Sequence, residues 1–179
     1  MTKVVNIQSY RAKVLQQRAF GQWEKRFKES YNLQTRLSDL SDKTLYFLAQ
    51  PGENSSTAFY ELIMGILELG SAIKFNYLPN KEQMRVVDIH LFLADQVRFE
   101  VMRRLKWLVK LPCEKCNLIE MVQDIDKIKP ESKESPPELS ASHPDNVSYQ
   151  QLATGDKEVF IRRMLRDAIE AFKDRLTSF

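Results

Sequence analysis

The chain contains little of what most catalytic and cofactor-binding sites are built from. It has five glycines, and neither G-x-x-x-x-G-K-[ST] nor G-x-G-x-x-G occurs, so a glycine-rich nucleotide cradle is not supported. Its two histidines cannot supply an H-E-x-x-H zinc motif or the paired Glu-x-x-His motifs of a di-iron bundle. A G-x-S-x-G nucleophile elbow is also missing. These absences favour a non-enzymatic protein without a cofactor, and they leave open an active site of unusual construction.

Long apolar runs are missing as well. The longest span only a few residues, whereas a membrane-spanning helix needs roughly 20. The beginning of the chain has neither the apolar stretch nor the cleavage site of a secretory signal. Two cysteines cannot form a disulfide framework. We therefore expect a cytoplasmic protein without a transmembrane segment.

Charge is distributed unevenly along the chain, although the formal net charge is only +3. Residues 1–36 carry eight Lys and Arg against two Asp and Glu, whereas residues 37–84 carry three against six. Basic helices that contain aromatic residues can contact nucleic acid or an acidic partner. Here the aromatic residues recur at helical spacing, which is typical of a core-facing stripe, and the pI near 8.8 is low for a dedicated nucleic-acid binder. Nucleic acid is therefore the less favoured partner.

The low glycine content and the spacing of apolar residues predict an all-α fold. We expect an irregular bundle of five or six helices with two long central helices, over residues 57–77 and 81–109. The apolar residues of the second cover more than one stripe, which predicts a helix covered from two directions. The bundle, with its basic N-terminal helix, takes residues 1–128. A Pro-, Ser- and Glu-rich linker follows in 129–155, extended rather than helical in its proline-rich part, and an amphipathic helix in 156–179 packs on the bundle or on a partner.

The N-terminal helix is expected to change its apolar face near Gly21. Ile7, Tyr10 and Leu15 lie on one side, whereas a second stripe lies nearly opposite, formed by Phe20, Trp23, Phe27 and Tyr31. Either the helix kinks or its two halves bury against different partners, as an arm reaching a second subunit would do. Together with the excess helix length and the missing catalytic motifs, this pattern predicts an interaction module in regulation or assembly. We expect it to form a homodimer or to bind another protein.

Both cysteines lie in the stretch LPCEKCNL, as a Cys113-x-x-Cys116 pair. Structural zinc needs four ligands and this pair provides two. Pro112 in a first helical turn would place Cys113 at a helix N-terminus, where a thiolate is stabilised, but no βαβ pattern surrounds the pair. Structural thiols are the favoured interpretation, and a redox or zinc protein that uses the pair is the alternative.

A buried polar cluster is the second candidate site. Glu61 and Glu68 lie at the edge of the first long helix, and His90 and Arg98 lie near the apolar side of the second. If these edges face each other, carboxylate and guanidinium form an internal pair. Such a pair either lines a pocket for a polar ligand or, in the favoured interpretation, fixes the register of the helices.

Small residues recur at heptad spacing beside that edge, at Ala58, Gly65 and Ala72. Small side chains allow a second helix to approach closely. Tight packing inside the monomer is favoured over a dimer contact.

Overall fold

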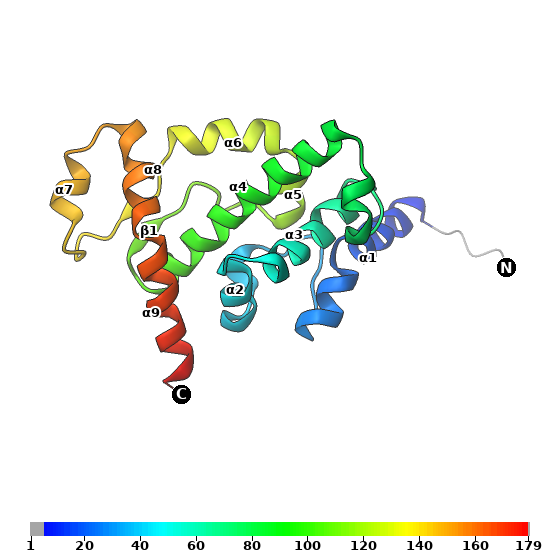
Figure 1. The fold of residues 1–179 in the computed structure, drawn as a ribbon, viewed down its shortest axis with the longest axis horizontal. Coiled ribbons are helices and arrows are strands. Elements are labelled where there is room, and N and C mark those ends of the chain that lie inside the picture. The colour runs from blue at the N-terminus through cyan, green and yellow to red at the C-terminus, as the bar shows by residue number, and fades with distance from the viewer. Residues whose placement is uncertain (1–5, 179) are drawn as a thin grey trace.

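The fold is described by a computed structural model that covers residues 6–178. Over that range it contains nine α-helices, two short 3-10 helices and one two-stranded sheet (Figure 1). In chain order the elements are α1 (Ile7–Phe27), η1 (Leu37–Asp39), α2 (Asp42–Ala49), α3 (Glu53–Ile66), η2 (Ala72–Tyr77), α4 (Asn80–Arg104), β1 (Leu108–Lys110), α5 (Leu118–Gln123), α6 (Ile125–Glu134), β2 (Glu138–Leu139), α7 (Asn146–Gln150), α8 (Thr154–Arg163) and α9 (Leu165–Thr177). The expected all-α class is confirmed, with more and shorter helices than the five or six expected. Across these described residues, no helix is both long and apolar enough for a bilayer span.

Local capping fixes where several helices begin. The Asn6 side chain accepts a hydrogen bond from the backbone of Gln8 at the start of α1, and the Ser41 hydroxyl accepts one from Thr44 at the start of α2. At α5, Asn117 and Glu120 form a reciprocal capping box. Each cap satisfies backbone N–H groups that the first helical turn leaves without an intrahelical partner.

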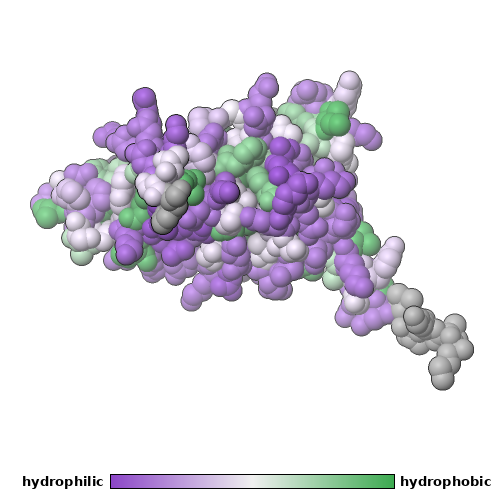
Figure 2. Space-filling view, turned by 90° about the horizontal axis from the view of Figure 1, so that it is seen from below, coloured by the Kyte–Doolittle hydropathy of each residue, from purple (hydrophilic) through white to green (hydrophobic). Residues whose placement is uncertain are grey.

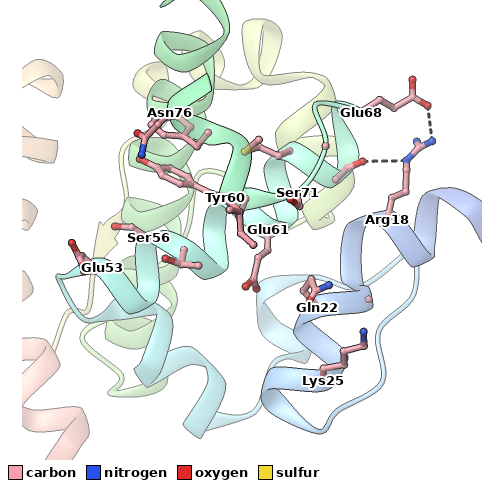
Figure 3. Close-up of a pocket in the computed structure, with 18 of the residues that line it drawn as sticks. Arg18, Gln22, Lys25, Glu53, Ser56, Tyr60, Glu61, Glu68, Ser71 and Asn76 are labelled. Carbon is pink, nitrogen blue, oxygen red and sulfur yellow. Dashed lines mark hydrogen bonds and ion pairs between the residues drawn. The ribbon is translucent and has the colours of Figure 1, made fainter. Parts of the chain in front are cut away.

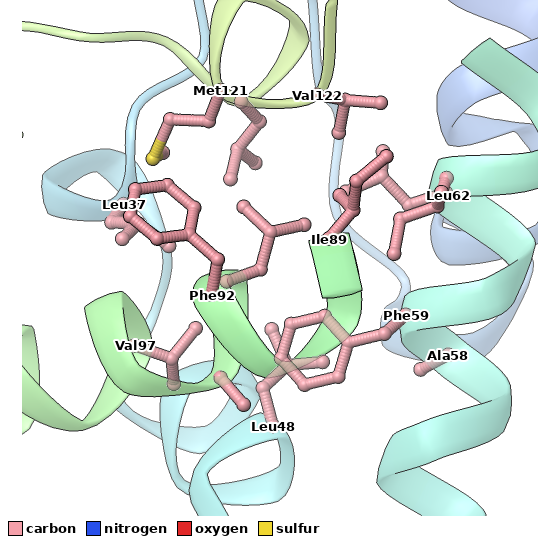
Figure 4. Close-up of a cluster of buried hydrophobic side chains, with 14 of the residues drawn as sticks. Leu37, Leu48, Ala58, Phe59, Leu62, Ile89, Phe92, Val97, Met121 and Val122 are labelled. Carbon is pink, nitrogen blue, oxygen red and sulfur yellow. The ribbon is translucent and has the colours of Figure 1, made fainter. Parts of the chain in front are cut away.

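Helix α4 crosses the middle of the molecule and contributes to two hydrophobic cores (Figure 1). In the first core, Ile89, Phe92 and Val97 of α4 pack with buried side chains of η1, α2, α3 and α5 (Figure 4). In the second core, Phe99 and Met102 of α4 pack with buried residues of the later segments: Leu108, Leu111, Leu139, Tyr149, Ile161 and Ala168. The broad apolar pattern of α4 thus corresponds to burial in two separate clusters.

Helices α1 and α3 approach each other closely at Gly65. A Cβ atom added there would lie 2.0 Å from the backbone oxygen of Arg18, so only glycine permits this approach. About two turns earlier along α3, the indole N–H of Trp23 donates to the carbonyl of Ala58 over 2.7 Å. Ala58 and Gly65 therefore serve packing within one chain.

Helix α3 ends earlier than its apolar spacing predicts. Glu68 and Gly70 adopt left-handed backbone conformations, with φ of 58° and 91°, which interrupts the helix after Ile66. The expected helix over 57–77 is therefore wrong in its second half, from residue 67 onward, where η2 follows instead. Ile73 and Tyr77 continue the helical spacing of apolar residues on α3, which predicts burial, yet each is 86% exposed. Helix α4 similarly ends at Arg104 rather than at 109, because Lys106 takes φ of 64°.

The proline-rich segment is folded, which corrects the expectation of an extended chain. Helix α6 passes through Pro130, β2 pairs antiparallel with β1, and α7 follows. Tyr149 of α7 is 2% exposed, and its hydroxyl donates to the carbonyl of Pro137. The expected C-terminal helix is divided at Met164 into α8 and α9. The free energy gained by burying a few side chains in the second core exceeds the local preference of this Pro- and Ser-rich segment for an extended chain.

Candidate functional site

A groove of about 1120 Å³ lies between α1, α3 and η2. Its α1 wall presents polar side chains, among them Gln22 and Lys25, which face the α3 wall across the groove (Figure 3). The α3 wall carries Ser56 and Glu61, and η2 closes one end with Ile73 at its rim. The groove is therefore a mixed polar and apolar surface built by two helices and a 3-10 turn.

Two ion pairs connect the walls of this region. Arg18 of α1 pairs with Glu68 at 2.5 Å, and Arg26 of α1 pairs with Glu61 at 2.5 Å. Arg18 also donates from Nε to the carbonyl of Gly65 over 3.2 Å. Both glutamates of the predicted polar cluster are thus engaged by α1 and not by α4, because α1 is the helix that lies along α3 at Gly65.

The remaining members of that cluster, His90 and Arg98, lie near each other on α4. The His90 ring packs against Phe59 and Tyr60, with centroid distances of 5.1 and 5.3 Å. Burial lowers the pKa of His90, and the positive charge of Arg98 lowers it further. Arg98 donates from Nε to the carbonyl of Ala49 over 3.2 Å. The predicted pairing of Arg98 with a glutamate is therefore wrong for these described residues, and His90 is half-buried against aromatic side chains of α3.

Four large apolar side chains are exposed on α1 and η2, two of the elements that border the groove, and we call them the α1–η2 surface. They are Ile7 (65% exposed), Tyr10 (61%), Ile73 (86%) and Tyr77 (86%). Helix α1 continues through Gly21 without a break, and its N-terminal end protrudes from the body (Figure 2). The change of apolar face near Gly21 set Ile7 and Tyr10 apart from the core-facing residues of α1. The helical spacing of apolar residues continues past the end of α3, so it wrongly predicted that Ile73 and Tyr77 would be buried.

The Cys-x-x-Cys pair lies in a turn before α5. The backbone N–H of Cys116 donates to the carbonyl of Cys113 over 3.1 Å, and α5 begins only after Asn117. Cys113 is therefore not at a helix N-terminus, contrary to expectation. Burial raises the pKa of Cys113 to about 12, and the neighbouring Cys116 thiol adds to the shift. In the described part of the chain, no group of three or more potential metal-ligating side chains occurs.

A second, smaller pocket of about 390 Å³ lies beside the two thiols. Helix α4 contributes Gln96, Glu100 and Arg103 to it, and the opposite side is formed by η1 and the Cys-x-x-Cys turn. Glu100 is 2% exposed, and its carboxylate accepts hydrogen bonds from Arg103 and Arg104. The pocket is thus lined by polar and charged side chains of α4, Gln96 and Glu100, that are almost fully buried. Sequence reasoning missed this pocket, because its residues come from three separate segments.

Neither a protein-family model, nor a curated protein, nor a solved structure matches this chain. The geometry of the groove, the exposed apolar side chains and the smaller pocket is therefore the basis for inferring function.

Proposed function

We propose that the chain is a non-enzymatic interaction module that self-associates through the α1–η2 surface. The observation that carries this proposal is the exposure of Ile7, Tyr10, Ile73 and Tyr77 on α1 and η2, two of the elements that border the groove. Large apolar side chains gathered on one part of a surface are typical of protein–protein contacts, because burying them removes apolar area from water.

A second copy of the chain is the partner that this surface fits best. The groove and the exposed residues of η2 are neighbours, since Ile73 also lines the groove. An isologous contact needs such an arrangement, in which each copy offers both a projection and a hollow.

The two alternatives have less support. Arg18 and Arg26 of the basic block are already engaged by glutamates, which reduces the positive charge offered to nucleic acid. A redox or zinc role for Cys113 and Cys116 calls for thiolates, and the pKa of both thiols is raised by burial.

Mass in solution tests the proposal. Light scattering between about 1 and 100 µM should show a dimer for the unchanged chain, and a monomer for the double variant Ile73→Ser/Tyr77→Ser. Val147→Ser is the matched control, because Val147 is 70% exposed on α7 at the opposite end of the molecule (Figure 1). A monomer at every concentration, or a dimer that the double variant leaves intact, would overturn the proposal.

A further inference from the structure

The smaller pocket has walls that are fixed by contacts within the chain. Arg104 of α4 donates from Nη2 to the carbonyls of Leu37 and Ser38, over 3.1 and 3.3 Å. The backbone N–H of Leu118 donates to the carbonyl of Thr35 over 3.0 Å, which ties the segment after the cysteines to the segment before η1. The volume of about 390 Å³ falls within the range of small-molecule sites. The pocket is thus preformed and of suitable size for a small ligand.

Gln96 provides an unused polar group at this site. Its side chain lines the pocket and is 4% exposed. Within residues 6–178, its amide has no hydrogen-bond partner, whereas Glu100 one turn later is fully engaged. Among the described residues, no fully buried side-chain nitrogen or oxygen lacks a hydrogen-bond partner, so the Gln96 amide, which no protein group engages, is open to the pocket. A ligand in the pocket can therefore accept a hydrogen bond from this amide.

The charge of the lining favours an anion with a single negative charge. Arg36, Arg103 and Lys115 carry positive charge, and Glu100 and Glu114 carry negative charge, so one positive charge is in excess. Arg103 is held by Glu100 through two hydrogen bonds, of 2.7 and 2.6 Å. The Arg36 guanidinium has no hydrogen bond or ion pair among the described residues, and it lies near enough to Cys116 to act on that thiol. Arg36 is therefore a cation available to a ligand, as is Lys115, which also lines the pocket and has no ion pair among the described residues.

The rest of the lining is apolar. Leu37, Leu111 and Cys113 are 8%, 6% and 7% exposed and offer hydrocarbon and a neutral thiol to the pocket. An apolar body on the ligand would cover these side chains. We propose that this pocket binds a small organic monoanion, a carboxylate with a short apolar body, whose oxygens accept hydrogen bonds from Gln96 and Arg36. This site is separate from the proposed dimer surface, since the pocket and the groove share no lining residue.

Titration with hexanoate, followed by two-dimensional NMR of the full chain, tests the proposal directly. A ligand of this size is expected to bind with a Kd of about 1 mM, and its shifts should centre on Gln96 and the Cys-x-x-Cys turn. Gln96→Leu and Arg36→Gln should each weaken binding by at least about tenfold, because each removes a hydrogen bond to a charged oxygen. Arg163→Gln changes an exposed arginine of α8 that does not line the pocket, and it should leave the Kd unchanged.

Matched probes decide the ligand class. Hexan-1-ol, which has the same apolar body without the charge, should bind at least about tenfold more weakly than hexanoate. Equal binding of the alcohol would overturn the assignment of an anion site. Tighter binding of hexyl phosphate would overturn the preference for a monoanionic carboxylate. The absence of shifts with linear carboxylates of two to eight carbons, at about 10 mM, would overturn the proposal as a whole.

The thiols supply an independent measurement. Cys116 is half-buried at the pocket, so a bound ligand should limit its access to iodoacetamide. Saturating hexanoate should slow alkylation of Cys116 at least about fivefold, and Gln96→Leu should abolish that protection. An alkylation rate that hexanoate leaves unchanged, in a chain whose NMR shifts respond to it, would place the anion elsewhere and overturn the assignment.

Discussion

The two cores of this protein are built in different ways. The first core draws on long segments of regular helix, and its buried residues, such as Phe20, Leu62 and Ile89, recur at helical spacing in α1, α3 and α4. The second core draws on short pieces, among them the three-residue strand β1, the two-residue strand β2 and the five-residue helix α7. Local periodicity therefore encodes the first core, whereas the second depends on contacts between segments far apart in the chain.

Hydrogen bonds compensate for the short elements of the second core. The backbone N–H of Ser140 donates to the carbonyl of Trp107 over 2.8 Å, and the Asn146 side chain donates to the carbonyl of Leu139 over 3.2 Å. Arg162 of α8 pairs with Asp95 of α4 at 2.7 Å and so connects α8 to the central helix. These links satisfy polar groups that a short strand or helix leaves unpaired.

The largest effect is expected at the α1–α3 crossing of the first core. Gly65→Val would place a side chain 2.0 Å from the backbone oxygen of Arg18, which neither helix can avoid without separating. We expect the free energy of unfolding to fall by at least about 4 kcal/mol, measured by urea denaturation. Gly155→Ala is the control, because a Cβ there meets nothing within 4 Å. A similar loss in the free energy of unfolding of both variants would contradict the close contact of α1 and α3 at Gly65 as its cause.

The second core is tested by Ile161→Ala. Ile161 is fully buried, at 0% exposure, so its truncation leaves a cavity among the residues of the later segments. We expect a loss of about 3 kcal/mol in the free energy of unfolding, against a few tenths for Val159→Ala, which is 50% exposed on the same helix. Equal, small losses would show that residues 138–168 act as a tether rather than as a core.

The contrast between the two cores also explains which parts of the fold were predictable from the sequence. The helical class, a long helix beginning near Lys81 and the close packing at Gly65 were predictable, since each depends on periodicity or on residue size. The folding of the proline-rich segment was not. The segment is folded because Leu139 and Tyr149 pack in the second core with residues of α4 and with Ile161. No local sequence pattern indicates these contacts.

The candidate sites were predictable to a smaller extent. The pattern indicated Glu61 as half-buried and ion-paired, but the partner, Arg26, lies 35 residues away on α1. The smaller pocket was not predictable, because Gln96 reads as an ordinary polar residue in a helix. Its unused amide becomes informative only once η1 and the Cys-x-x-Cys turn are placed opposite it.

Alkaline pH should weaken the edge of the first core at Cys113. The folded chain holds this thiol protonated up to about 12, while the unfolded chain releases the proton near the ordinary value of 9.0. Between these values the folded state binds more protons, so the free energy of unfolding falls as pH rises, by at most about 1.4 kcal/mol per pH unit. Cys113→Val should remove this part of the pH dependence, as urea denaturation at several pH values would show. An unchanged dependence would contradict the raised pKa.

Acid should weaken the edge of the first core at His90, with a smaller effect. Burial against Phe59 and Tyr60 lowers the pKa of His90 from 6.5, so the unfolded chain takes up a proton that the folded chain refuses. The free energy of unfolding should therefore fall as pH drops below about 6.5, and His90→Gln should flatten this dependence. An acid dependence that His90→Gln leaves unchanged, in urea denaturation at several pH values, would contradict the lowered pKa of His90.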